Sequence, residues 1–146
     1  MSPVVPRAIP AARPIVKPVK PVRKATYFHA DHELLESVTA EILAGVVSGD
    51  HERVAAAITL LQTKLDAHLR DEETDILPQY AAHDPEDAAH ILAEHAAIRK
   101  SLADLDVMTD LHLVRADAIR AFVTALEAHA ARERAGMYKW AASSLA

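Results

Sequence analysis

Apolar residues recur at alternating steps of three and four in four successive segments of the chain. This spacing places them on one face of an α-helix, so each segment is expected to bury one stripe and to expose the rest. With 3 Gly and 4% aromatic residues, the hydrophobic half of the sequence consists mainly of Ala, Leu, Val and Ile, which favours helices over strands. We therefore predict an all-α fold, an antiparallel up-down-up-down four-helix bundle.

Three breaks separate the predicted helices. Gly49 suits a left-handed helix end and Asp50 a cap for the next helix, while Asp84 before Pro85 suits a cap with proline in the first turn. The third break is placed at residues 106 to 110, and the last long helix could begin anywhere from residue 110 to 118. Its candidate caps are Thr109, Asp110 and Asp117, and a short C-terminal helix is predicted from Met137 to Ala146, set off by Gly136.

Residues 1 to 24 differ in composition from the rest, with 6 of the 8 prolines, 6 basic residues and no acidic residue. Proline fixes φ and removes a backbone donor, so we expect a disordered, extended basic tail over 1 to 24 and the bundle over 25 to 146. The tail is either a solvated extension or a docking arm for an acidic partner protein. Residues 25 to 146 carry a net charge of −11, which argues against nucleic-acid binding by the folded body.

No stretch approaches 18 uninterrupted apolar residues, and the N-terminus has no hydrophobic signal region, so we expect no transmembrane segment and a cytoplasmic location. The absence of cysteine excludes disulfides, iron-sulfur clusters and thiolate zinc sites. A homo-oligomer stays open as an alternative, because the Ala-rich outer helix faces could pack together.

Each predicted helix carries one histidine on its apolar stripe, and two of the helices carry a glutamate one turn later. The inward residues are His32, His68, Glu72, His95, His129 and Glu133. A buried, unpaired carboxylate is costly and no Lys or Arg lies on the stripes, so a bound cation is the expected compensation. The other five of the 9 histidines fall on solvated faces or near loops and are expected at the surface: His29, His51, His83, His90 and His112.

Counting along the helices places the inward histidines at one level. His32 lies 17 residues before Gly49 and His68 lies 18 residues after Asp50, which at 1.5 Å per residue is roughly 26 Å from the turn for both. The second helix is expected to end near Tyr80, 12 residues after His68, and His95 lies 10 residues after Pro85, so these two match as well. His129 matches if the last helix begins near residue 117. Six imidazole and carboxylate donors without sulfur are too many for one tetrahedral zinc, so two metal ions in the bundle core are expected.

With these residues in place, the sequence resembles the hemerythrin-like proteins with an HHE cation-binding domain, over residues 26 to about 140. The matching stretches are Ala30-Asp31-His32-Glu33-Leu34-Leu35, His68 through Glu72 and Glu73 to Leu77-Pro78, Glu94-His95 with Ile98 and Leu102, and His129 to Glu133 followed by Met137-Tyr138. The resemblance implies that the six inward residues bind two non-haem iron ions bridged by carboxylates. It also implies binding of O2, NO or peroxide, for sensing, detoxification or iron and oxygen handling, and leaves catalytic turnover open.

One departure concerns the third helix, where oxygen-carrying hemerythrins have two ligand histidines four residues apart. Ile91 and Arg99 occupy the positions four before and four after His95, so one histidine is missing, with Glu94 or solvent as the substitutes considered. The last carboxylate, Glu133, follows its histidine by four residues, as in the HHE relatives. Peroxide or NO chemistry, sensing or iron handling is therefore favoured over reversible O2 carriage.

Three other kinds of helical or metal-binding protein share some of these features. Ferritin-type bundles use Glu-rich sites with a Glu-x-x-His order, and here the order is reversed. A zincin needs a second histidine where Glu36 stands. The remaining alternative is a metal-free or single-metal helical bundle that acts as an interaction module docked through its basic N-terminal tail.

Overall fold

The computed structural model describes residues 25 to 144, with side chains from residue 32 onward. The predictions for the basic tail over 1 to 24 and for the exposure of the His29 side chain lie outside what the structure describes. Every regular element in the described part is helical, so the prediction of an all-α fold is confirmed there. None of the helices between residues 25 and 144 combines the length and the apolar character that a membrane crossing requires.

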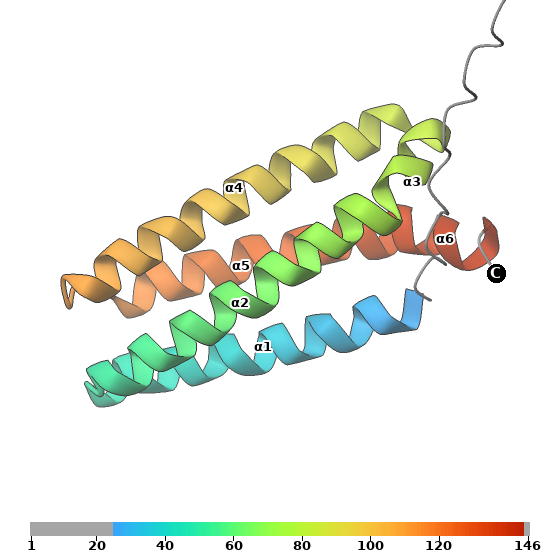
Figure 1. Ribbon diagram of the computed structural model, residues 1–146. Helices are drawn as coiled ribbons and strands as arrows, with labels where there is room; N and C mark the ends of the chain where they lie inside the picture. Colours follow the sequence, from blue (N-terminus) through green and yellow to red (C-terminus); the bar gives the residue numbers. More distant parts are fainter. Residues whose placement is uncertain (1–24, 145–146) are drawn as a thin grey trace, which may run out of the picture.

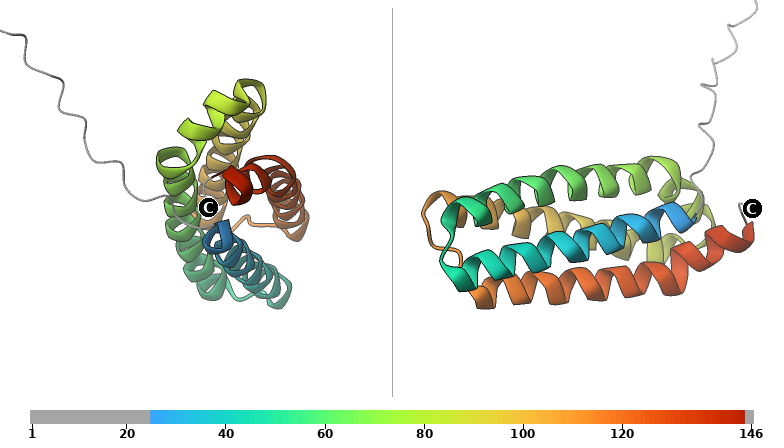
Figure 2. Two further views of the ribbon diagram at one scale, coloured as in Figure 1. Left: turned by 90° about the vertical axis from the view of Figure 1, so that its right-hand side faces the viewer. Right: turned by 90° about the horizontal axis from the view of Figure 1, so that it is seen from below.

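Four long helices form the body of the molecule: α1 (Ala25–Ser48), α2 (His51–Asp75), α4 (Pro85–Asp110) and α5 (Ala116–Glu133). α1 and α4 each pack against both α2 and α5, so the four helices surround one shared interior (Figures 1 and 2). Shorter elements close one end of the body: α3 (Leu77–His83), the π-helical turn η1 (Arg134–Tyr138) and α6 (Lys139–Ser144). This closed end is also the end at which α1 begins (Figure 1).

Local sequence determines the first two boundaries as expected. Gly49 adopts a left-handed conformation with φ of 71°, and the Asp50 side chain accepts a hydrogen bond of 3.1 Å from the backbone N–H of Arg53. The Asp84 side chain accepts in the same way from the backbone N–H of Asp87, at 3.0 Å. Both predicted caps are therefore confirmed.

Other helix ends differ from the sequence prediction. The second helix, expected to continue to near Tyr80, breaks at Ile76, because Pro78 has no N–H for the helical ladder and its ring crowds the preceding turn. α4 continues to Asp110, through the segment assigned to the third break. α5 begins inside the expected range, but Arg115 occupies the cap position without a side-chain bond, so none of the three candidate caps acts there.

The C-terminal end also differs, because α5 continues directly into η1 and α6. Gly136 lies inside the π-helical turn and does not set off the last helix, which begins at Lys139. The widened turn will matter for the site, since it changes which residues after Glu133 face the interior.

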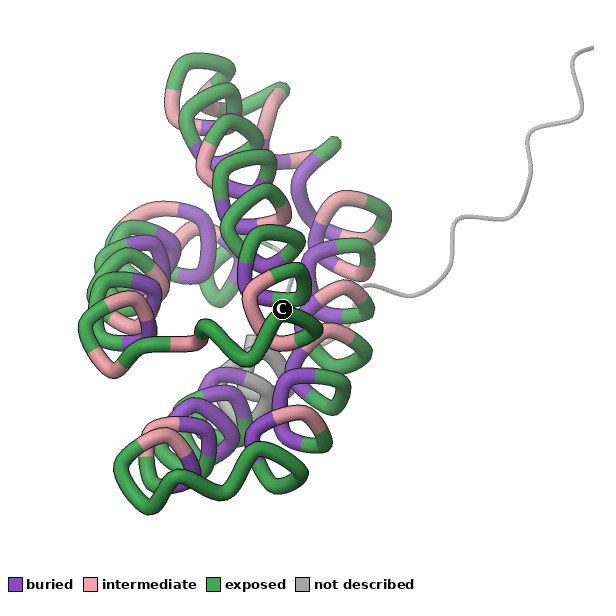
Figure 3. Tube along the Cα trace, turned by 90° about the vertical axis from the view of Figure 1, so that its left-hand side faces the viewer, coloured by how far each residue is buried: buried purple, intermediate pink, exposed green. Residues whose placement is uncertain are grey.

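Burial follows the apolar stripes of the sequence (Figure 3). One apolar cluster includes Leu65, Ile98 and Phe122, and a second, at the closed end, includes Ile91 and Met137. Along α4 and α5 the chain passes from one cluster to the other through the inward histidines and glutamates. These polar residues therefore form a layer enclosed by apolar side chains on both sides.

Candidate metal centre

All six inward residues predicted from the stripes are buried, with at most 8% of any of them exposed. α1 contributes His32, α2 contributes His68 and Glu72, α4 contributes His95, and α5 contributes His129 and Glu133. Their donor atoms form two groups, each with atoms within 4.8 Å of one another. The first group is His32, His68, Glu72 and Glu133, and the second is Glu72, His95, His129 and Glu133. The two glutamates are thus shared.

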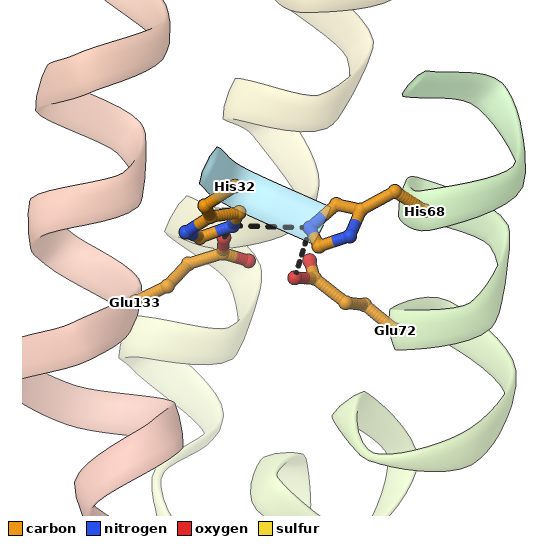
Figure 4. Close-up of side chains that lie close together, drawn as sticks. All are labelled: His32, His68, Glu72 and Glu133. Carbon is orange, nitrogen blue, oxygen red and sulfur yellow. Dashed lines mark hydrogen bonds and ion pairs between the residues drawn. The ribbon is translucent and has the colours of Figure 1, made fainter. Parts of the chain in front are cut away.

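The first group joins α1, α2 and α5 (Figure 4). Nε2 of His32 lies 3.1 Å from Nε2 of His68, which in turn lies 2.7 Å from Oε1 of Glu72. Oε1 of Glu133 lies 3.5 Å from Nε2 of His32. All four side chains point toward one another, so their nitrogen and oxygen atoms surround one small volume.

The second group contains the same two carboxylates. Oε2 of Glu72 lies 3.1 Å from Nε2 of His95, and Oε2 of Glu133 lies 3.5 Å from that nitrogen. Oε1 of Glu133 lies 3.0 Å from Nε2 of His129. Each carboxylate therefore faces histidines of both groups, which is the arrangement that a carboxylate bridging two cations requires.

Many polar atoms of this layer have no hydrogen-bond partner among the described residues. They are His32 Nδ1, Glu72 Oε2, His95 Nε2, His129 Nε2 and both carboxylate oxygens of Glu133. His129 Nε2 and Glu133 Oε1 illustrate the point, because they are close together but not oriented as a hydrogen bond. An unsatisfied buried polar group costs about 1–3 kcal/mol. Cations that accept lone pairs from several directions would satisfy all of these atoms except His32 Nδ1, which lies on the other side of its ring from Nε2. These residues therefore fit a metal.

The carboxylates also hold positive charge in the core. Burial lowers the pKa of His95, but the neighbouring carboxylates of Glu133 and Glu72 outweigh burial and raise the pKa to about 10. Burial likewise opposes the charged form of His129, and Glu133 outweighs it and raises the pKa of His129. Protons on imidazoles or metal cations can supply this charge, and metal binding displaces the protons.

The outer nitrogen of His95 is held by a chain of charged groups. Nδ1 of His95 donates to Oε1 of Glu73 at 2.9 Å, and the Arg99 guanidinium donates to both Glu73 oxygens, at 2.7 and 2.9 Å. The hydrogen bonds from Arg99 hold the pKa of Glu73 below its usual value. With Nδ1–H directed outward, Nε2 of His95 keeps its lone pair for the centre.

A second chain of the same kind serves His129. Its Nδ1 lies 3.1 Å from Oε2 of Glu94, and Arg132 contacts Glu94 while its Nη1 donates to Asp87 at 3.1 Å. Glu94, considered from the sequence as an extra ligand, thus lies at the outer nitrogen of His129 and in neither donor group. Sequence reasoning missed the positioning roles of both chains. For the groups at His95, two signals were available in the sequence: Glu73, the carboxylate next to Glu72, and Arg99, the arginine one turn after His95.

Tyr138 is a further buried residue that the stripe pattern did not select. Its hydroxyl donates to Oε1 of Glu72 and lies 3.3 Å from Nε2 of His32. One signal for it was present in the sequence, because Met137-Tyr138 follows Glu133 in the last stretch that resembles the hemerythrin-like proteins. Its approach to the centre depends on the π-helical turn.

The remaining described histidines are exposed, as expected, and belong to neither donor group: His51, His83, His90 and His112. The rings of His51 and His112 stack at 4.7 Å between centroids, at the end of the molecule opposite α3 and α6. His83 stacks against Trp140 at 5.6 Å. Three of these four exposed histidines therefore stack against another ring of the protein.

A small, largely apolar cavity adjoins the centre between α1, α2 and α5. Three of the inward histidines line it, His32, His68 and His129, together with apolar side chains that include Leu35 and Leu65. Its volume of about 20 Å³ is of the order that one water-sized molecule needs. The centre therefore borders a space suited to a small molecule.

Comparison with known proteins agrees with this geometry. The model of the hemerythrin HHE cation binding domain matches residues 24–141, a range that contains all six inward residues. Searches of curated proteins and of solved structures found no match. The match extends over most of the chain and names a cation-binding domain, and the structure contains His and Glu groups that could hold a metal. The chain belongs to the hemerythrin HHE cation-binding domain family.

Proposed function

We propose that this protein is a non-haem di-iron protein of the hemerythrin type, with its metal centre in an up-down-up-down bundle. The colour order along the ribbon supports this topology, because consecutive long helices run in opposite directions in Figure 1. His32 and His68 would bind one ion, His95 and His129 would bind the other, and Glu72 and Glu133 would bridge them.

The observation that carries the proposal is the sharing of Glu72 and Glu133 by two donor groups that contain buried atoms without hydrogen-bond partners among the described residues. These atoms are Glu72 Oε2, His95 Nε2, His129 Nε2 and both carboxylate oxygens of Glu133. Two adjacent cations would satisfy these atoms, whereas a single tetrahedral zinc would use only four donors. Nitrogen and oxygen donors without sulfur suit iron. Six protein donors on two six-coordinate ions also leave positions for an external ligand.

We further propose that this ligand is O2, NO or peroxide. When bound, a pair of redox-active ions with open positions supplies binding and electron exchange for such molecules. The chain contributes a buried centre and the small cavity lined by His32, His68 and His129, whose size suits a small molecule. Ile91 and Arg99 occupy the two positions, four before and four after His95, at which a second histidine of this helix could stand, and its absence favours peroxide or NO chemistry over reversible O2 carriage.

The test is metal analysis of protein purified without chelators, with absorption spectra before and after addition of azide, peroxide or NO. We expect about two irons per chain, with bands that change when the ligand is added. The His90→Ala variant, which removes an exposed histidine of α4, should behave like the wild type. One zinc or no metal in well-folded protein would contradict the proposal and favour an interaction module docked through the basic tail.

A further inference from the structure

Tyr138 places a phenol oxygen beside the first donor group. Its side chain is buried, with a relative exposure of 3%, and its ring centroid lies 5.5 Å from that of His32. The hydroxyl contacts Oε1 of Glu72 and lies 3.3 Å from Nε2 of His32. The phenol is therefore next to two atoms proposed to bind the same ion.

Four donor atoms form a closed ring at this point: His32 Nε2, His68 Nε2, Glu72 Oε1 and Tyr138 Oη. The separations are 3.1 Å between the two nitrogens, 2.7 Å from His68 to Glu72, and 3.3 Å from Tyr138 to His32, and the Tyr138 hydroxyl contacts Glu72 directly. Neighbouring donors of an octahedral ion with bonds of about 2.1 Å are about 3 Å apart. The phenol oxygen thus contacts one proposed donor of this ion and lies 3.3 Å from another, so it belongs to the same ring of donor atoms.

The backbone brings Tyr138 to this position through η1, which begins directly after Glu133. A regular α-helix would place Met137, four residues after Glu133, on the inward face. The wider π-helical turn places the fifth residue there as well, and both Met137 and Tyr138 are buried. Single π-helical turns are uncommon and frequently occur at functional sites.

We propose that Tyr138 is a seventh protein ligand and binds, through its phenolate oxygen, the ion held by His32 and His68. This inference rests on the proposed metal centre. As the oxygen binds the ion, the phenol O–H bond breaks and the proton passes to solvent, with no electron transferred. The ion held by His95 and His129 then keeps more positions for an external ligand, because Ile91 and Arg99 stand one turn before and after His95 in place of a second histidine.

The test compares ferric wild-type protein with Tyr138→Phe and Tyr80→Phe by iron content, visible absorption and resonance Raman spectroscopy. A phenolate bound to ferric iron gives a visible charge-transfer band and enhanced phenolate ring vibrations. Tyr80→Phe is the matched control, since Tyr80 is also buried but donates to Asp87 at 2.7 Å, outside both donor groups. We expect both features in wild type and Tyr80→Phe, and their loss in Tyr138→Phe while iron remains bound.

Iron-loaded wild-type protein without phenolate vibrations, or a Tyr138→Phe variant that keeps them, would overturn the assignment and leave the di-iron proposal intact. Wild-type protein that binds no iron would instead refute the metal centre itself, and the tyrosine ligand with it. If Tyr138→Phe does not fold, the Tyr27→Phe/Tyr80→Phe variant gives the same answer, because Tyr138 is then the last of the 3 tyrosines. Phenolate vibrations in that variant support the assignment, and their absence overturns it.

Discussion

The carboxylate of Glu94 lies 3.1 Å from Nδ1 of His129, the ring nitrogen that does not face the shared glutamates. Because a carboxylate accepts at Nδ1, the proton of the neutral imidazole sits there and Nε2 keeps its lone pair for the centre. Glu73 does the same for His95, at 2.9 Å. An arginine holds each of these carboxylates in place, so both rings are oriented before any ion binds.

Removing either carboxylate is therefore expected to weaken metal binding without removing a ligand. For Glu94→Ala and Glu73→Ala we expect a loss of roughly 10- to 100-fold in metal affinity, as is typical of groups that orient ligand histidines. Chelator competition monitored by absorption measures this loss. Glu52→Ala, which removes an exposed carboxylate near the start of α2, is the control. Wild-type metal affinity in both variants would show that these carboxylates and their arginine partners only stabilise the fold.

Loss of individual donors should change the metal content in a pattern set by the two groups. Since Glu72 belongs to both groups, Glu72→Ala is expected to lose both ions. His32→Ala and His129→Ala each affect one group and should retain about one ion per chain. Metal analysis with circular dichroism as a folding check measures the pattern. Full occupancy in Glu72→Ala would be incompatible with a bridging role.

Removal of the metal should destabilise the protein, because the unsatisfied atoms and the buried carboxylates then lack a cation. At a free metal concentration of 100 times Kd, binding contributes about 2.7 kcal/mol. For a domain of this size that corresponds to a difference in Tm of roughly 5 to 10 °C. Thermal melts with and without a strong chelator measure it. Identical melting curves would mean that the core is satisfied without a cation.

The turn between α1 and α2 should tolerate asparagine better than alanine at Gly49. Its φ of 71° is strained for residues with a Cβ, although no atom lies within 4 Å of where that Cβ would stand. We expect Gly49→Ala to lower the free energy of unfolding by about 1 kcal/mol and Gly49→Asn by about half of that. Urea unfolding of metal-saturated protein distinguishes them. An alanine variant as stable as the wild type would show that the turn adopts another conformation.

The sequence predicted burial well, because a helix with 3.6 residues per turn leaves a readable stripe. Counting at 1.5 Å per residue also predicted that His68 and His95 would reach one level, and the structure brings them to the same carboxylate. The break at Ile76 was readable in principle from Pro78, but the apolar period continues across it and suggested one helix. Whether the six residues bind metal remains a prediction for experiment.

Two features of the centre could not be obtained from periodicity. Tyr138 faces inward because a π-helical turn adds a residue after Glu133, and an α-helical count selects Met137 instead. The second feature is the pair of carboxylate–arginine contacts, Glu73 with Arg99 and Glu94 with Arg132. These contacts depend on the conformations of long side chains at the edges of the apolar stripes. Spacing gives the direction of the Cβ atom but not the position of a guanidinium several bonds further out.

The most direct test of the central claim is a crystal structure of iron-loaded protein with anomalous scattering recorded at the iron edge. A bridged pair predicts two anomalous peaks roughly 3.5 to 4 Å apart. One should lie against His32 and His68 and the other against His95 and His129, with Glu72 and Glu133 between them. A single peak, or peaks away from these residues, would contradict the two-metal centre.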